Sequence, residues 1–226
     1  MEVGFVLRIN KKQLQFFFKA GRAKIVFVDG MPRSGSTLVF NAMRLVLQAD
    51  PACDLQSSWV RNARHLPRAN TYLIKTHGMN LIDAWRASKI VYSYRDPRVA
   101  LVSHSRKFGT TPSIEMVHQW MRDFNFAEQH AGLMFGYEDM VKDVPAVVHA
   151  LADYAGCEVD SAEIADNVNL LVRQGDDQSE AVTLLHGSHR TGTKDDEWRL
   201  FLPQALQTQI TNEYSPWLER HGYPLR

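Results

Sequence analysis

The sequence predicts an α/β protein with a central parallel sheet flanked by helices. Three short apolar segments, 24–30, 71–77 and 88–96, have the composition of strands that are buried on both faces of such a sheet. Segments with helical periodicity alternate with them, and this order is typical of a parallel sheet. Ligands of such sheets bind beyond the carboxyl ends of the strands, so residues at those ends are the first site candidates.

The composition limits the class of protein. The 226 residues include 26 Lys and Arg against 25 Asp and Glu, which gives a net charge of +1 and favours no nucleic-acid partner. Two cysteines without metal-ligand spacing favour a reducing compartment. No apolar run reaches transmembrane length, so no stable membrane insertion is expected. We therefore expect a single cytoplasmic domain over residues 1–226.

The first predicted strand leads into a glycine-rich turn and then a helix. The strand is KIVFVDG, the turn is MPRSG, and apolar side chains recur with helical spacing from Ser36 onward. In this context, backbone N–H groups and the helix N-terminus can bind a phosphate or sulfate, and the hydroxyls of Ser34 and Thr37 can add hydrogen bonds. The alternative is a turn that binds nothing.

One position separates this turn from a nucleotide-binding P-loop. Gly30, Gly35 and Thr37 fit the pattern G-x-x-x-x-G-K-[ST], but Ser36 stands where the lysine belongs. That lysine reaches the β- and γ-phosphates, so its absence disfavours triphosphate chemistry. The nearest cation is Arg33, inside the loop, and its guanidinium suits a shorter anionic chain.

The second and third predicted strands both end in charged or polar residues. TYLIKTH ends with Lys75 and His77, which share one side of the strand because they are two residues apart. SKIVYSYRD ends near Arg95, and the Asp-Pro pair that follows is typical of a helix start. We expect these ends to meet Gly30 at one edge of the sheet.

The remainder of the chain continues the alternation. Helices are predicted at 114–129, 144–156 and 202–222, and a further short strand at 133–140. No internal repeat or linker interrupts this order.

Several segments resemble, in order, the motifs of sulfotransferases that use 3′-phosphoadenosine 5′-phosphosulfate (PAPS). PRSGST is similar to the 5′-phosphosulfate loop of that family, IKTH to its catalytic strand end and YRDPRVALVSHS to its 3′-phosphate motif. GYEDM and HRTGTKDDEWRLFLPQ resemble its later nucleotide-site segments. The resemblance implies a P-loop NTPase-like sulfotransferase fold, PAPS as donor substrate and PAP as product.

The resemblance also implies two anion pockets. PAPS carries a 5′-phosphosulfate and a separate 3′-phosphate, so a protein that binds it needs positive charge at two places. Arg95 and Ser103 have the separation of eight residues found in the family's 3′-phosphate motif. The implied cofactor-binding residues are Arg33, Ser34, Gly35, Ser36 and Thr37 for the phosphosulfate, Arg95, Ser103, Arg190 and Gly192 for the 3′-phosphate, and Tyr137 for the adenosine.

One position departs from the resemblance. Leu38 stands where many cytosolic members carry an aromatic residue that stacks on adenine. Adenine stacking is therefore expected from another residue, Trp198 or Phe108.

The expected catalytic residues are His77, Lys75 and Arg33. Imidazole titrates near neutrality, so His77 is the expected general base for the acceptor, with a glutamate from elsewhere as the alternative. Lys75 and Arg33 would stabilise the bridging oxygen and the transferred group. A sulfuryl group carries less negative charge than a γ-phosphoryl group, so no metal is expected. The acceptor would be a hydroxyl or amine of a glycan or small metabolite.

Two other functions fit parts of the pattern. One is a P-loop-type nucleotide kinase, and the other is a non-enzymatic module that binds an adenosine bisphosphate. Neither of these functions explains the IKTH segment or the spacing of Arg95 and Ser103, which would then be coincidences. The short dimerisation motif of the animal cytosolic sulfotransferases is not found, so no oligomer is implied.

Overall fold

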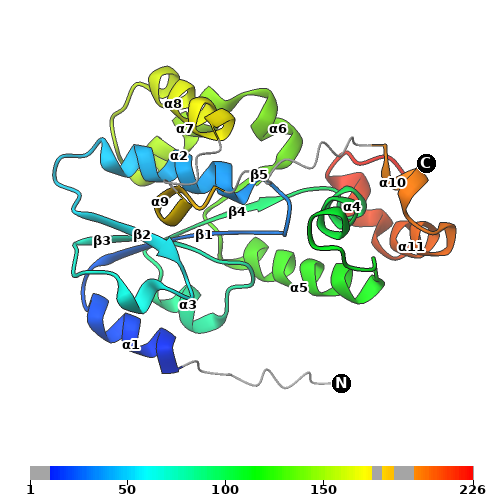
Figure 1. The fold of residues 1–226 in the computed structure, drawn as a ribbon, viewed down its shortest axis with the longest axis horizontal. Helices are drawn as coiled ribbons and strands as arrows, with labels where there is room; N and C mark the ends of the chain where they lie inside the picture. The colour runs from blue at the N-terminus through cyan, green and yellow to red at the C-terminus, as the bar shows by residue number, and fades with distance from the viewer. Residues whose placement is uncertain (1–10, 175–179, 186–195, 226) are drawn as a thin grey trace.

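The protein is built around a five-stranded sheet in the order β2-β3-β1-β4-β5, in which every neighbouring pair is parallel. The computed structural model describes residues 11–174, 180–185 and 196–225, and helices cover both faces of the sheet (Figure 1). This confirms the predicted fold class. The strands are β1 (Lys24–Gly30), β2 (Leu55–Trp59), β3 (Thr71–Lys75), β4 (Lys89–Tyr94) and β5 (Leu133–Gly136).

One face of the sheet packs against the helix that follows the glycine-rich turn. α2 (Ser36–Gln48), α7 (Val144–Ala155) and α8 (Ser161–Gln174) lie together on this face (Figure 1). Their apolar side chains form one buried cluster with Val28 of β1 and Val91 of β4. This burial fixes α2 so that its N-terminus begins directly beyond the carboxyl end of β1.

The opposite face is covered by helices from both halves of the chain. α1 (Lys11–Ala20), α3 (Leu81–Arg86) and α5 (Ile114–His130) lie on this side (Figure 1). Beside them, α4 (Pro97–Phe108), α10 (Trp198–Phe201) and α11 (Gln204–Arg220) share a second apolar cluster with α5. The remaining elements are α6 (Tyr137–Lys142), α9 (Glu180–Thr183) and a 3₁₀ turn at Ala63–His65.

Several predicted elements have different boundaries in the structure. The predicted strands 71–77 and 88–96 are shorter, at Thr71–Lys75 and Lys89–Tyr94. The segment 133–140 is a strand only to Gly136, and α6 begins at Tyr137 with Glu138 and Asp139 in its first turn. Acidic side chains stabilise a helix N-terminus, which explains why the strand does not continue. The segment 202–222 is likewise a helix only from Gln204, because Pro203 separates α10 from α11.

Helix length bears on the expectation of no membrane insertion. The longest helices in the described ranges, α5 and α11, have 17 residues each and carry charged side chains. No helix among the described residues is long and apolar enough to cross a membrane.

The strand register places the predicted site residues together. Val28 of β1 pairs with Lys75 of β3, and Gly30 of β1 pairs with Ser93 of β4. The carboxyl ends of these three central strands are therefore neighbours, which is the edge where the sequence places the site.

Candidate functional site

The loop after β1 makes a tight turn into α2. Gly35 is the N-cap of α2 and has a left-handed backbone with φ 80°, and Arg33 also has a positive φ of 70°. A Cβ atom at Gly35 would lie 3.1 Å from both Tyr137 and Met140, so glycine lets the loop pass close to α6. The first N–H groups of α2 begin at Ser36 and are suited to an anion.

Ser34 holds this loop against the sheet. Its side chain is buried, its Oγ lies 2.7 Å from the Oγ of Ser93, and it donates a hydrogen bond of 3.0 Å to the Ser93 carbonyl. Its backbone N–H donates to the carbonyl of Met31 at 3.1 Å. In this structure Ser34 therefore anchors the loop to β4, a contact that the motif alone does not indicate.

The residues predicted for the two anion pockets contact one another. Arg33 Nε donates a hydrogen bond of 3.0 Å to the Oγ of Ser103 on α4. Burial lowers the pKa of Arg33, and the positive charge of nearby Arg95 lowers it further. These two guanidinium groups lie close together and are partly removed from water. They therefore attract an anion strongly.

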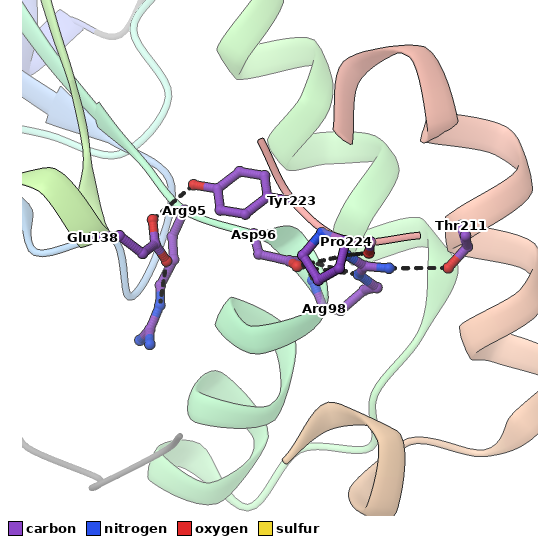
Figure 2. Close-up of polar contacts among 7 residues, drawn as sticks. All are labelled: Arg95, Asp96, Arg98, Glu138, Thr211, Tyr223 and Pro224. Carbon is purple, nitrogen blue, oxygen red and sulfur yellow. Dashed lines mark hydrogen bonds and ion pairs between the residues drawn. The ribbon is translucent and has the colours of Figure 1, made fainter. Parts of the chain in front are cut away.

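Arg95 is buried where β4 passes into α4. Its guanidinium lies 3.9 Å from the ring centroid of Tyr137, and its Nε lies 3.6 Å from Oε1 of Glu138 (Figure 2). Tyr137, predicted for the adenosine, has its ring against Arg95 in this structure. The sequence reasoning did not single out Glu138, because its pairing with Arg95 depends on where α6 packs.

Lys75 lies at the end of β3 and is buried beside the loop. Its Nζ donates a hydrogen bond to the Oγ1 of Thr37, in the first turn of α2, and lies 5.7 Å from the ring centroid of Trp59. Burial, together with the charge of Arg33, lowers the pKa of Lys75 to about 7. Lys75 therefore lies in one group with Thr37 and Arg33 of the loop.

His77 follows β3 and is held by the end of β1. Its Nδ1 lies 2.6 Å from the carbonyl oxygen of Gly30. A carbonyl oxygen only accepts, so Nδ1 carries the proton and Nε2 keeps its lone pair. Desolvation, reinforced by Lys75, lowers the pKa of His77 below its usual value. His77 is at the same time exposed to solvent, so an acceptor can reach it.

Asp29 is a site-supporting residue that the sequence reasoning missed. Its buried carboxylate accepts hydrogen bonds from the backbone N–H groups of Gly30, Gly78 and Met79 at 2.8, 3.1 and 3.1 Å. Burial raises the pKa of Asp29 to about 7 despite these bonds. The carboxylate thereby fixes the turn that follows His77. The sequence does carry a signal for this role, because Asp29 is an acidic residue that directly follows the apolar run of the strand.

The remaining predicted contacts have different outcomes. Arg190 and Gly192 lie outside the described residues. Trp198 is buried, with the guanidinium groups of Arg98 and Arg199 4.1 and 4.3 Å from its ring centroid, so it is not positioned to stack on adenine. Phe108 is 58% exposed and is the candidate that remains.

Comparison with known proteins gives similarity in structure rather than in sequence. No protein-family model and no curated protein sequence matches the chain. The structure of mouse sulfotransferase SULT7A1 complexed with PAP matches with a TM-score of 0.64 and 13% identity, over 93% of this chain and 90% of that chain.

Two further solved structures are of retinol dehydratase. The complex with androsterone and the inactive cofactor PAP matches with a TM-score of 0.58 and 18% identity, over 92% of this chain and 84% of that one. The complex with retinol and PAP matches with a TM-score of 0.55 and 18% identity, over 92% of this chain and 86% of that one. The chain therefore shares its fold with mouse sulfotransferase SULT7A1 and with retinol dehydratase, both solved with PAP.

Proposed function

We propose that the protein is a sulfotransferase that moves a sulfuryl group from PAPS to an acceptor hydroxyl or amine and releases PAP. The observation that carries this proposal is the hydrogen bond between Arg33 and Ser103, because it joins the two motifs that the sequence reasoning assigned to different phosphates. The fold shared with mouse sulfotransferase SULT7A1, which was solved with PAP, supports it independently.

The donor would be held at two places. Residues 33–37 and the N-terminus of α2 would take the 5′-phosphosulfate, with backbone N–H groups as donors. Arg95 and Ser103 would take the 3′-phosphate, and Arg190 and Gly192 would close over it. The left-handed Gly35 and the adjoining guanidinium groups are features of this chain that fit such an anion.

The residues at the strand ends would carry out the transfer. His77 Nε2 would accept the acceptor proton as the acceptor oxygen or nitrogen forms its bond to sulfur. The bond that breaks joins sulfur to the bridging oxygen, and Lys75 and Arg33 would stabilise the charge that develops on the departing phosphate. A lowered pKa at His77 keeps the imidazole unprotonated at neutral pH, as a general base requires.

The surroundings of His77 favour an acceptor with an apolar surface. The Trp59 ring lies 5.2 Å from the His77 ring, so an aromatic surface borders the proposed base. The solved complexes of retinol dehydratase with androsterone and with retinol contain small apolar alcohols. We therefore place small alcohols and phenols first among the acceptors, with amines and glycans as alternatives.

The test is mass spectrometry of acceptor panels incubated with PAPS. The panel holds steroid and retinoid alcohols, phenols, amines and oligosaccharides, and EDTA is present throughout. The proposal predicts an acceptor that gains one sulfuryl group together with stoichiometric release of PAP, and a much slower formation of both products with His77→Ala.

The alternatives give different results in parallel reactions. Turnover that needs ATP and Mg²⁺ and ignores PAPS would favour a nucleotide kinase and contradict the proposal. Tight PAP binding with no transfer to any acceptor would favour a non-enzymatic adenosine-bisphosphate module.

A further inference from the structure

A chain of polar contacts runs from the C-terminal end of the protein to Arg95. The Oη of Tyr223 donates a hydrogen bond of 2.9 Å to Oε2 of Glu138. The other carboxylate oxygen of Glu138 lies 3.6 Å from the Nε of Arg95 (Figure 2). Residues 223–225, which follow α11, are called the C-terminal tail here. Glu138 thus contacts this tail with one oxygen and Arg95 with the other.

The end of α11 aims Tyr223 in this direction. Gly222 has a left-handed backbone with φ 74°, its N–H donates to the Glu219 carbonyl at 3.1 Å, and the N–H of Tyr223 donates to the Leu218 carbonyl at 2.8 Å. This pair of bonds is the Schellman motif, in which a glycine reverses the chain at a helix end. The residues after Gly222 therefore leave α11 in a defined direction.

Arg98 fastens the tail to the start of α4. Its side chain is fully buried, and its Nη2 donates to the Pro224 carbonyl and to Asp96, both at 2.7 Å. Its Nη1 donates to the Oγ1 of Thr211 on α11 at 3.2 Å (Figure 2). The tail, α11 and the start of α4 are thus tied together three residues beyond Arg95.

These contacts constrain the orientation of the Arg95 side chain. Glu138 lies at its Nε, the Tyr137 ring lies against its guanidinium, and its terminal nitrogens point away from Tyr223 (Figure 2). Burial and the neighbouring Glu138 raise the pKa of Tyr223 above its usual value, so its hydroxyl remains a donor. When the Nε of an arginine is already fixed, its two terminal nitrogens can bind an oxyanion with a smaller loss of side-chain entropy than in a freely moving arginine.

We propose that Tyr223 is a positioning residue for the 3′-phosphate pocket, acting through Glu138 to orient Arg95. The proposal rests on the proposed function, because it needs the 3′-phosphate of PAP as the ligand of Arg95. It makes the C-terminal tail part of the nucleotide site, although the tail is 85 residues from Glu138 in sequence.

The test compares two nucleotides that differ only in the 3′-phosphate. Calorimetry of PAP and of 5′-AMP gives an affinity ratio for each variant, and a merely structural defect lowers both affinities. With Tyr223→Phe we expect PAP to bind about tenfold more weakly, as for a lost hydrogen bond to a charged group, while 5′-AMP is unaffected. The control is Tyr154→Phe, which removes a hydroxyl bonded to the Ile90 backbone N–H at 3.2 Å and leaves the ratio unchanged.

A double-variant cycle tests the route through Glu138. In the Glu138→Ala background, adding Tyr223→Phe should leave the ratio of PAP to 5′-AMP affinity unchanged, whatever Glu138→Ala does alone. An equal effect of Tyr223→Phe in both backgrounds would overturn the inference. If the wild type prefers PAP and Tyr223→Phe leaves the ratio of PAP to 5′-AMP affinity undiminished, the inference alone is overturned. A wild type without that preference would overturn the proposed function as well.

Discussion

The Nε of Arg33 donates a hydrogen bond of 3.0 Å to the Oγ of Ser103, across 70 residues of sequence. One residue belongs to the loop after β1 and the other to α4, which follows β4. The contact exists because β1 and β4 are neighbours in the sheet and their carboxyl ends coincide. A ligand with two anionic groups can therefore meet both segments at once.

Arg95→Ala should weaken PAP binding about ten- to a hundredfold, because a hydrogen bond between charged groups is lost. Turnover at saturating donor should change much less, since Arg95 is assigned to the 3′-phosphate and not to the reacting sulfur. Calorimetry and steady-state kinetics measure the two effects. Arg68→Ala, an exposed arginine before β3, is the control and should bind PAP normally. Unchanged PAP affinity in Arg95→Ala would exclude Arg95 from the pocket.

His77→Ala should lower kcat by about a hundredfold or more, because the general base is lost. PAP affinity should stay close to that of the wild type, since the imidazole is assigned to the acceptor side. His149→Ala, on the exposed surface of α7, is the matched control and should keep full activity. Normal turnover in the His77 variant would remove it from the reaction.

Asp29→Asn should lower kcat about tenfold with little change in PAP affinity. An asparagine can still accept at Oδ1, but its NH₂ group would face the N–H of Met79, so the turn after His77 should shift. Asp83→Asn is the control, because Asp83 is an equally buried carboxylate that accepts from the backbone N–H of Asn80, the N-cap of α3. It should lose thermal stability and keep its kcat. Equal kcat losses in the two variants would show only general destabilisation.

PAP binding at pH 8 should take up a proton at Lys75. Burial, with Arg33, lowers the pKa of Lys75 to about 7, so most of the amine is neutral at pH 8 in the free protein. A bound polyanion favours the ammonium form and raises this pKa, so a proton enters on binding. Calorimetry in buffers of different ionisation enthalpy measures that uptake, and Lys75→Met should abolish most of it. A binding enthalpy independent of the buffer would contradict the assignment.

The sequence predicts the buried strands better than the sheet edge. The apolar run 24–30 coincides with β1, because a strand buried on both faces is apolar throughout. β2, with the sequence LQSSW, was not predicted, since an edge strand is only partly buried and carries polar residues. The split of 133–140 into β5 and α6 depends on packing that periodicity does not reveal.

The same distinction applies to the site. Lys75, His77 and Arg95 follow from strand ends, Arg33 from its place in the glycine-rich loop, and Ser103 from the resemblance to the 3′-phosphate motif of sulfotransferases, so local sequence was sufficient to nominate them. The contacts that hold these side chains in place were not predictable from local sequence. The link from Tyr223 to Glu138 joins residues 85 positions apart and exists only because α11 packs beside α4.

The most direct measurement of the central claim is the affinity of the wild-type protein for PAP, 5′-AMP and 3′-AMP in EDTA at one salt concentration. If two adjoining pockets bind one nucleotide, PAP should bind at least about tenfold more tightly than either monophosphate, because each pocket contributes a charged contact. Binding of PAP no tighter than that of 5′-AMP would contradict the account.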